Sequence, residues 1–120
     1  MEQYKLGEKE QRFADLIWKH EPVSSRELTV LCAKKFDWKR TTTYTMLKRL
    51  CMRKIFKNQD GTVSSLMTKE EFLTAQGEQF LEKSFEGSLP KFLTAFAKRN
   101  KLSAKEIQEI QSLIDNHKEE

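Results

Sequence analysis

The chain has 120 residues, of which 38% are hydrophobic, so it has room for one domain or two very small ones and none for a catalytic cleft between large domains. Its net charge is +4, but residues 1 to 60 carry 14 Lys and Arg against 8 Asp and Glu, whereas residues 61 to 120 carry 8 against 10. A basic front half suits a polyanion, and a near-neutral rear half rich in Phe and Leu suits self-association.

Several functional classes are excluded by what the sequence does not contain. Cys32 and Cys51 stand apart on apolar helical faces and are expected to be reduced core thiols. His20 and His117 have no second ligand at helical spacing, so we expect no metal and no cofactor. No catalytic set and no phosphate-binding glycine loop occurs, and we expect no enzyme. No apolar run approaches the roughly 20 residues that span a bilayer and no signal-peptide core is present, which predicts a cytoplasmic protein.

Two helices are predicted at the start of the chain. Apolar residues spaced three and four apart predict the first over residues 7–20, and Pro22 ends it. Ser24 and Glu27 form a capping box, a pair that satisfies free backbone N–H groups at a helix start, and it opens a second helix over residues 25–36.

A third helix is predicted over residues 40–54, only three or four residues after the second. This spacing is typical of a helix-turn-helix. Residues 55–66 then predict two short strands around an Asp60-Gly61 turn, because Asp-Gly readily adopts the positive φ angles of a tight hairpin. A hairpin in this place is the wing of a winged helix.

Three more helices are predicted in the rear half. Thr68 and Glu71 form a second capping box, at the start of a long helix that extends to about residue 86. Pro90 lies in the first turn of the next helix, where its missing N–H costs little. A third capping box, at Ser103 and Glu106, opens the last helix.

The apolar stripes of these rear helices are too large for three short helices to bury within one chain, so a homodimer interface is expected, with an internal core as the alternative. Its candidate residues are Phe80, Phe85, Leu89, Phe92, Leu93, Phe96, Ile107, Ile110, Leu113 and Ile114. The sequence therefore predicts a mainly α fold, with a winged-helix DNA-binding domain over residues 1–67 and a helical dimerisation domain over residues 68–120.

The third predicted helix combines a buried seam with a basic outer face rich in hydroxyl groups. From Lys39 to Lys57 there is no Asp or Glu, whereas an ordinary solvated face mixes carboxylates with its cations. Recognition helices contact base edges near their N-terminus, where hydroxyl groups can donate or accept. We therefore predict base contacts from Thr41, Thr42, Tyr44, Thr45 and Lys48. A buried or capping threonine is the alternative, above all for Thr42.

Cations around this helix are predicted to hold DNA phosphates, with solvated surface as the alternative. They are Lys39, Arg40, Arg49, Arg53 and Lys57. The amides and dipole at the start of the second helix could hold a further phosphate beside Ser24, Ser25 and Arg26, which is compatible with simple capping.

Motifs spread over nearly the whole chain, in the same order, resemble the penicillinase repressors, the BlaI/MecI family, to which copper-responsive CopY-type repressors are related. The first motif is Leu6-Gly7-Glu8 followed by Leu16-Ile17-Trp18. The second joins Trp38, Thr42, Thr45, Met46, Leu47, Arg49 and Leu50. The third comprises Phe85, Gly87, Ser88 and Leu89, then Leu102-Ser103, Glu106-Ile107 and Glu109-Ile110.

The resemblance implies a repressor whose third helix enters the major groove of a partly palindromic operator and whose three rear helices entwine with those of a partner chain. It implies control of antibiotic-resistance or cell-envelope stress genes, and a membrane sensor protease as a further partner. In penicillin-responsive members that protease cuts an Asn-Phe bond in the helix before the last. The matching pair here is Ala95-Phe96, so the polar P1 side chain is absent.

Two further departures from the family pattern concern the helix end and the wing. A Gly common at the end of the third helix is Lys54 here, and the basic and aromatic residues usual in the second wing strand are replaced by Val63, Ser64, Ser65 and Leu66. A weaker contribution of the wing to DNA affinity is implied. The alternative function, from another class, is a winged-helix adaptor whose basic helix binds an acidic protein.

Overall fold

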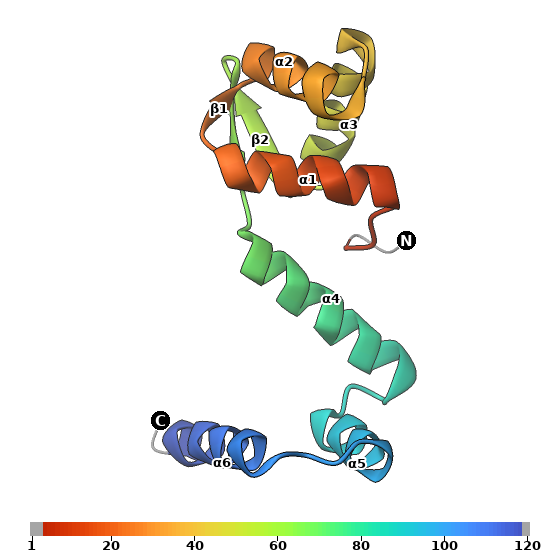
Figure 1. Cartoon of the computed structure of the whole chain (residues 1–120), viewed down its shortest axis with the longest axis vertical. Helices are drawn as coiled ribbons and strands as arrows, with labels where there is room; N and C mark the ends of the chain where they lie inside the picture. Colours follow the sequence, from red (N-terminus) through yellow and green to blue (C-terminus); the bar gives the residue numbers. More distant parts are fainter. Residues whose placement is uncertain (1–3, 119–120) are drawn as a thin grey trace. The chain divides into compact units, whose positions relative to one another are not determined.

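The computed structural model describes residues 4–118, and within them six helices and a small antiparallel sheet, which confirms the predicted fold class (Figure 1). The elements are α1 (Glu8–His20), β1 (Val23–Ser24), α2 (Ser25–Phe36), α3 (Arg40–Met52), β2 (Phe56–Gln59), β3 (Thr62–Ser65), α4 (Lys69–Ser84), α5 (Leu89–Arg99) and α6 (Ala104–Lys118). None of the helices described is long and apolar enough to cross a bilayer.

The chain forms two compact units that divide after Gly77, inside α4. The boundary expected from the sequence, between residues 67 and 68, lies earlier. The difference arises because Phe72, in the first turn of α4, is completely buried in the core of the N-terminal unit. The N-terminal unit therefore consists of the winged helix together with the first half of α4.

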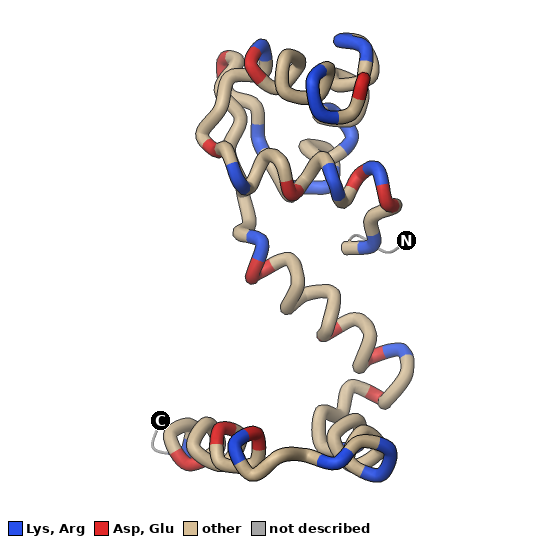
Figure 2. Tube along the Cα trace, in the orientation of Figure 1, with Lys and Arg blue, Asp and Glu red and all other residues tan. Residues whose placement is uncertain are grey.

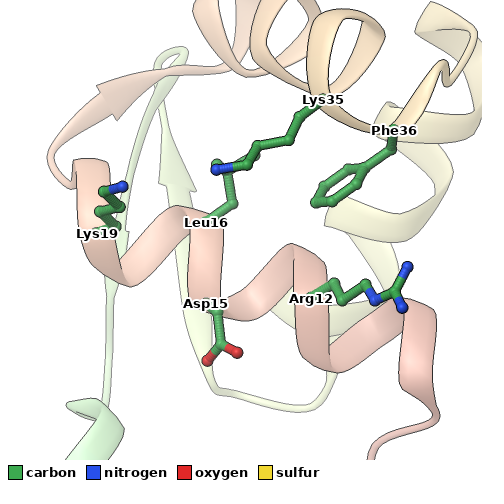
Figure 3. A pocket seen from close by; sticks show the side chains of 6 residues that line it. All are labelled: Arg12, Asp15, Leu16, Lys19, Lys35 and Phe36. Carbon is green, nitrogen blue, oxygen red and sulfur yellow. The ribbon is translucent and has the colours of Figure 1, made fainter.

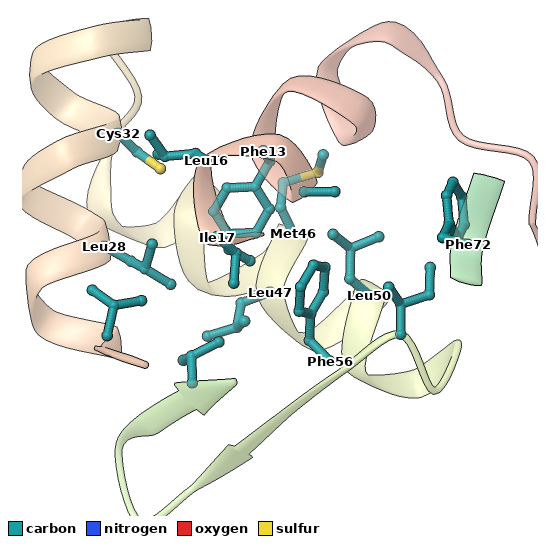
Figure 4. Close-up of a cluster of buried hydrophobic side chains, with 14 residues drawn as sticks. Phe13, Leu16, Ile17, Leu28, Cys32, Met46, Leu47, Leu50, Phe56 and Phe72 are labelled. Carbon is teal, nitrogen blue, oxygen red and sulfur yellow. The ribbon is translucent and has the colours of Figure 1, made fainter. Parts of the chain in front are cut away.

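The core of the N-terminal unit lies between α1, α2, α3 and the sheet, where apolar side chains from each element meet (Figure 4). The inward side of α3 is formed by Met46, Leu47 and Leu50, as its spacing predicts. The buried apolar residues are Phe13, Ala14, Leu16, Ile17, Val23, Leu28, Cys32, Met46, Leu47, Leu50, Ile55, Phe56, Val63 and Phe72.

The predicted capping groups are present at the helix starts. The Ser24 hydroxyl accepts the Glu27 N–H at 3.0 Å. The Thr68–Glu71 box is reciprocal, since the Thr68 hydroxyl accepts the Glu71 N–H at 3.0 Å and the Glu71 carboxylate accepts the Thr68 N–H at 2.7 Å. The Ser103–Glu106 box is reciprocal in the same way. These short-range side-chain bonds explain why the predicted helix starts agree with the structure.

Helix α3 ends at Met52 and not at residue 54 as predicted, because Lys54 adopts a left-handed backbone with φ of 65°. This conformation is uncommon for a residue with a side chain and readily accessible to glycine. Lys54 thus occupies the conformation that the family's glycine would suit.

The predicted hairpin is confirmed, with positive φ angles at both turn residues, 52° at Asp60 and 85° at Gly61. Strand β1 was not predicted. It pairs with β3, Val23 opposite Val63, so the sheet order is β1-β3-β2. A strand of two residues directly before a helix is too short to leave a period-two pattern in the sequence.

Aromatic side chains join α1 to the wing and to the start of α4. The Trp18 indole N–H donates to the Met67 carbonyl at 3.1 Å, and its ring centroid lies 5.2 Å from that of Phe56 and 5.5 Å from that of Phe72. The ring centroid of the other tryptophan, Trp38, lies 5.6 Å from that of Phe13 on α1. Both tryptophans thus belong to the N-terminal unit.

Both cysteines are free thiols, as predicted. Cys32 is buried in the core, whereas Cys51 is half-buried and packs at the edge of it. Burial raises the pKa of both thiols, and the Thr43 hydroxyl opposes this effect on the pKa of Cys32 by a hydrogen bond. The raised pKa keeps both thiols protonated near neutral pH.

The C-terminal unit, by contrast, has no buried residue in α5 or α6. Four phenylalanines of this unit make a ring cluster with centroid separations between 5.3 and 5.9 Å, and they are Phe80, Phe85, Phe92 and Phe96. Even so, the side chains of Phe80 and Leu113 remain 51% and 68% exposed. The apolar stripes of this unit are present but not covered.

Candidate nucleic-acid interface

The outer face of α3 presents the residues predicted to contact bases. Thr41, Thr42, Thr45 and Lys48 are exposed, and Tyr44 is half-buried. The buried threonine of this run is Thr43, which is only 1% exposed. The buried-threonine alternative considered for Thr42 thus applies to its neighbour, and Thr42 itself lies among the exposed candidates.

Four of the predicted DNA-contact residues converge where the starts of α2 and α3 meet. The Arg40 guanidinium carbon lies 5.7 Å from the centroid of the Tyr44 ring. A hydrogen bond with Ser25 lowers the pKa of Tyr44, and a hydrogen bond with Arg40 and the positive charges of Arg40 and Arg26 lower it further. A phenol whose ionised form is favoured in this way marks a region of positive potential, which suits a phosphate.

The start of α2 is fastened to the wing. The Ser25 N–H donates to the Gly61 carbonyl at 2.8 Å, and Ser24 pairs with Thr62 across β1 and β3. The Ser25 amide is therefore already engaged. What this helix start offers to a phosphate is the Arg26 guanidinium and the Ser25 hydroxyl, which also hydrogen-bonds Tyr44, rather than all of the amides that the sequence suggests.

Arg53 occupies a different position from the other predicted phosphate contacts. Its guanidinium donates to the Lys5 carbonyl at 2.7 Å and lies 3.8 Å from the Glu10 carboxylate. Its side chain is 24% exposed, against 55% for Arg49, which lies 4.0 Å from the same carboxylate. These contacts favour a role for Arg53 in holding the N-terminal segment against the end of α3.

This role was not predicted, because the acceptor is a backbone carbonyl 48 positions away in the sequence and no local pattern indicates it. The same segment is held from a second side, where the Gln76 side-chain amide donates to the Tyr4 carbonyl at 2.7 Å. The sequence gives one indication of this contact, which is that Gln76 is a polar residue on the otherwise apolar stripe of α4.

The wing carries few groups that suit DNA. Lys57 on β2 is exposed. On β3, Val63 is buried in the core, and the Ser65 N–H donates to the Glu21 carboxylate at 2.7 Å. Asp60 places a negative charge at the exposed tip of the hairpin. Lys and Arg are spread over the helices of the unit (Figure 2), and the run from Lys39 to Lys57 is the part in which no carboxylate accompanies them.

The other predicted site residues lie in the C-terminal unit. Ala95 and Phe96 fall inside α5, with Ala95 exposed and Phe96 40% exposed. The dimer candidates lie on α4, α5 and α6 or in the turn after α4, and each is exposed or half-buried. None of the ten is used to complete a closed core within the chain.

Comparisons with known proteins agree with this arrangement. The model of the penicillinase repressor family matches residues 6–116. A penicillinase repressor of Bacillus licheniformis is 24% identical over 117 residues, which cover 94% of this chain and 91% of that protein. A penicillinase repressor of Staphylococcus aureus is 26% identical over 106 residues, which cover 85% and 84% of the two chains. The chain therefore belongs to the penicillinase repressor family of transcriptional repressors.

Proposed function

We propose that the protein is a dimeric repressor that binds a partly palindromic operator and controls antibiotic-resistance or cell-envelope stress genes. The observation that carries this proposal is the outer face of α3, where exposed hydroxyl groups and cations stand without a carboxylate, with Ser25 and Arg26 of α2 beside them. Such a face offers charge to phosphates and short donors to base edges.

One set of residues contacts the bases of the duplex, and a second set contacts its phosphates. Thr41, Thr42, Thr45 and Lys48 contact base edges in the major groove, which carries a distinct donor and acceptor pattern for each base pair. Around them, Lys39, Arg40, Arg49 and Lys57, with Ser25 and Arg26, hold phosphates on either side of the groove. Tyr44, beside Arg40 and Ser25, belongs to both sets. This division predicts that only the first set affects the choice of sequence.

A gel-shift titration with matched variants tests this division. Genomic fragments retained by the purified protein supply the operator. We expect Thr45→Ala and Lys48→Ala each to weaken operator binding by about 1–3 kcal/mol while leaving random duplex nearly unchanged. The controls are Thr74→Ala and Lys34→Ala, which remove the same groups from exposed helical positions outside the interface.

Arg26→Gln provides the opposite pattern, since the loss of a phosphate contact should weaken operator and random duplex alike and reduce the dependence of affinity on salt. If Thr45→Ala and Lys48→Ala lower affinity for both duplexes equally, α3 does not read sequence. A protein that instead binds acidic proteins would show no preferred duplex at any salt concentration.

The uncovered stripes of α5 and α6 support dimerisation, since a second copy of the chain would cover them. A two-fold dimer presents two recognition helices to a palindromic operator. Joining the two half-site contacts raises the effective concentration of the second, so the dimer binds far more tightly than one unit alone.

Release from the operator is proposed not to follow the family's cut at an Asn-Phe bond. Ala95 lacks the polar P1 side chain, so a sensor protease that uses that contact would leave it unfilled. We expect intact protein in host cells in which a β-lactam has induced transcription. Immunoblotting checks this, and a fragment that ends at Ala95 would show that the same cut is used.

A further inference from the structure

A small hollow lies between α1 and the last turn of α2, away from the residues assigned to DNA. Its volume is about 430 Å³, and it is lined by Arg12, Asp15, Leu16, Lys19, Lys35 and Phe36 (Figure 3). Cavities that bind small molecules usually have volumes of about 300–1,000 Å³. The hollow is therefore large enough for a compact organic molecule and too small for a folded partner.

The floor of the hollow is apolar. Leu16 contributes a side chain that is only 4% exposed, and Phe36 contributes a half-buried ring. Figure 3 shows this ring pointing into the space between the two helices. The ring is held in place by Trp38, whose centroid lies 5.0 Å away. A preformed apolar floor of this kind favours a ligand with a flat or branched hydrocarbon body.

The rim of the hollow is cationic. Lys19 and Lys35 are exposed, and neither has an ion-pair partner within residues 4–118. Arg12 makes an exposed pair with Glu8 on its own helix, at 2.7 Å, an arrangement that stabilises little and leaves the guanidinium able to turn. Three cations beside an apolar floor suit a negatively charged ligand.

The one carboxylate in the lining does not cancel this charge. Asp15 accepts the Gln11 side-chain amide at 3.1 Å and lies 3.0 Å from the Lys69 ammonium. In Figure 3 it points to the side of α1 opposite Lys35 and Phe36. Its charge is thus compensated by the Lys69 ammonium and not by the cations of the rim.

We propose that this hollow binds a small organic acid, with its apolar body on Leu16 and Phe36 and its carboxylate held by Lys19 and Lys35. The DNA backbone is not the occupant favoured by the geometry. Lys35 is near the end of α2 and Ser25 begins it, so at 1.5 Å per residue the two are roughly 15 Å apart along the helix. The site is independent of the proposed operator binding.

Nuclear magnetic resonance titration of the full chain with 3-phenylpropionate tests the site, with the uncharged 3-phenylpropionamide as the comparison ligand. We expect saturable shifts of backbone amides around residues 12–19 and 35–36 with the acid at millimolar concentration. Lys19→Gln combined with Lys35→Gln should weaken binding of the acid about tenfold, because the binding free energies of two exposed charge contacts add.

The matched control combines Lys9→Gln with Lys34→Gln, which removes the same charge from exposed positions of the same two helices outside the hollow. This variant should bind the acid as the unaltered chain does. The proposal is overturned by any of these results: no saturable shift, equal binding of acid and amide, or equal weakening in both double variants.

Two further measurements test whether the hollow binds a protein segment or DNA instead of a small organic acid. An acetylated Asp-Phe-Glu peptide that shifts the same amides while the acid does not would show that the hollow takes a protein segment instead. A reduced salt dependence of duplex binding in the Lys19 and Lys35 double variant, but not in the control, would assign the two lysines to DNA. Because the titration uses free protein, its outcome is distinguishable from any failure of the proposed repressor function.

Discussion

The two units differ in what they bury, although both are built from short amphipathic helices. The N-terminal unit encloses fourteen apolar residues between three helices and a sheet. Helices α5 and α6 enclose none, and their apolar stripes remain open. The first unit has a sheet beside its helices, whereas the second half of α4, α5 and α6 make up the C-terminal unit without a strand among its described residues. One unit completes a core alone, and in the proposed dimer a partner chain would supply the surface that covers the stripes of the other.

The largest effect is expected from a charge placed on the open stripe. Leu113 is 68% exposed, so in a monomer Leu113→Asp would be an ordinary surface change. In a dimer it buries an unpaired charge, which should weaken association by roughly 3–5 kcal/mol for each copy. Sedimentation equilibrium measures the shift.

Ser112→Asp is the control, because it adds the same charge on the opposite face of α6, where Ser112 is exposed and polar. It should leave association unchanged. If the unaltered chain sediments as a compact monomer at micromolar concentration, the stripes of α5 and α6 do not need a partner chain, and the proposed dimer is wrong.

The next largest effect, on folding stability, is expected from the position at which the N-terminal unit is truncated. A fragment that ends at Gly77 should fold as a stable monomer, whereas one that ends at Met67 loses Phe72 and should be about 3–5 kcal/mol less stable, as for other buried Phe side chains that are removed. Urea unfolding followed by circular dichroism measures both. Phe72→Ala in the longer fragment should reproduce most of the loss. Equal stability of the two fragments would place the boundary where the sequence suggested it.

A smaller effect is expected at Arg53, where a long-range contact closes the N-terminal unit. Arg53→Ala removes the bond to the Lys5 carbonyl and should lower the free energy of unfolding by about 1–3 kcal/mol. Arg49→Ala, whose side chain is more exposed, should cost less than about 1 kcal/mol. If Arg53→Ala instead leaves stability unchanged and weakens every duplex alike, the phosphate contact predicted from the sequence is right.

The smallest effect should be a gain. Lys54→Gly relieves the left-handed backbone at φ of 65° and should stabilise the N-terminal unit by about 1 kcal/mol. Lys54→Ala removes the same charge but keeps the strain, so it should give no such gain. Thermal unfolding distinguishes them, and equal stabilisation by both would point to charge rather than backbone conformation.

The features that local chemistry determines could be predicted from the sequence. The capping residues Ser24, Thr68 and Ser103 each act within three residues, and the Asp60-Gly61 turn acts within two, so their effects on helix starts and on the hairpin appear in the sequence itself. The inward side of α3 follows from its helical period for the same reason.

Features that depend on contacts between distant segments could not be predicted. The pairing of Val23 with Val63, the burial of Phe72 beside Trp18 and the bond from Arg53 to Lys5 all join residues far apart in the chain. The same holds for the candidate interface. The sequence identified the outer face of α3, but only the fold shows Tyr44 beside Ser25 and the Ser25 amide already bound to Gly61.

Because Trp18 and Trp38 both lie in the N-terminal unit, tryptophan fluorescence distinguishes changes in that unit from changes in the C-terminal unit. Both tryptophans and both tyrosines lie within the first 44 residues, and phenylalanine is the only aromatic residue of the C-terminal unit. Ultraviolet emission excited at the tryptophan band therefore reports on the winged helix alone. If two chains associated through α5 and α6 came apart, the tryptophan emission would not change, whereas light scattering would decrease. Loosening of α4 from Phe56 and Trp18 would shift the emission to longer wavelength as water reaches the indole.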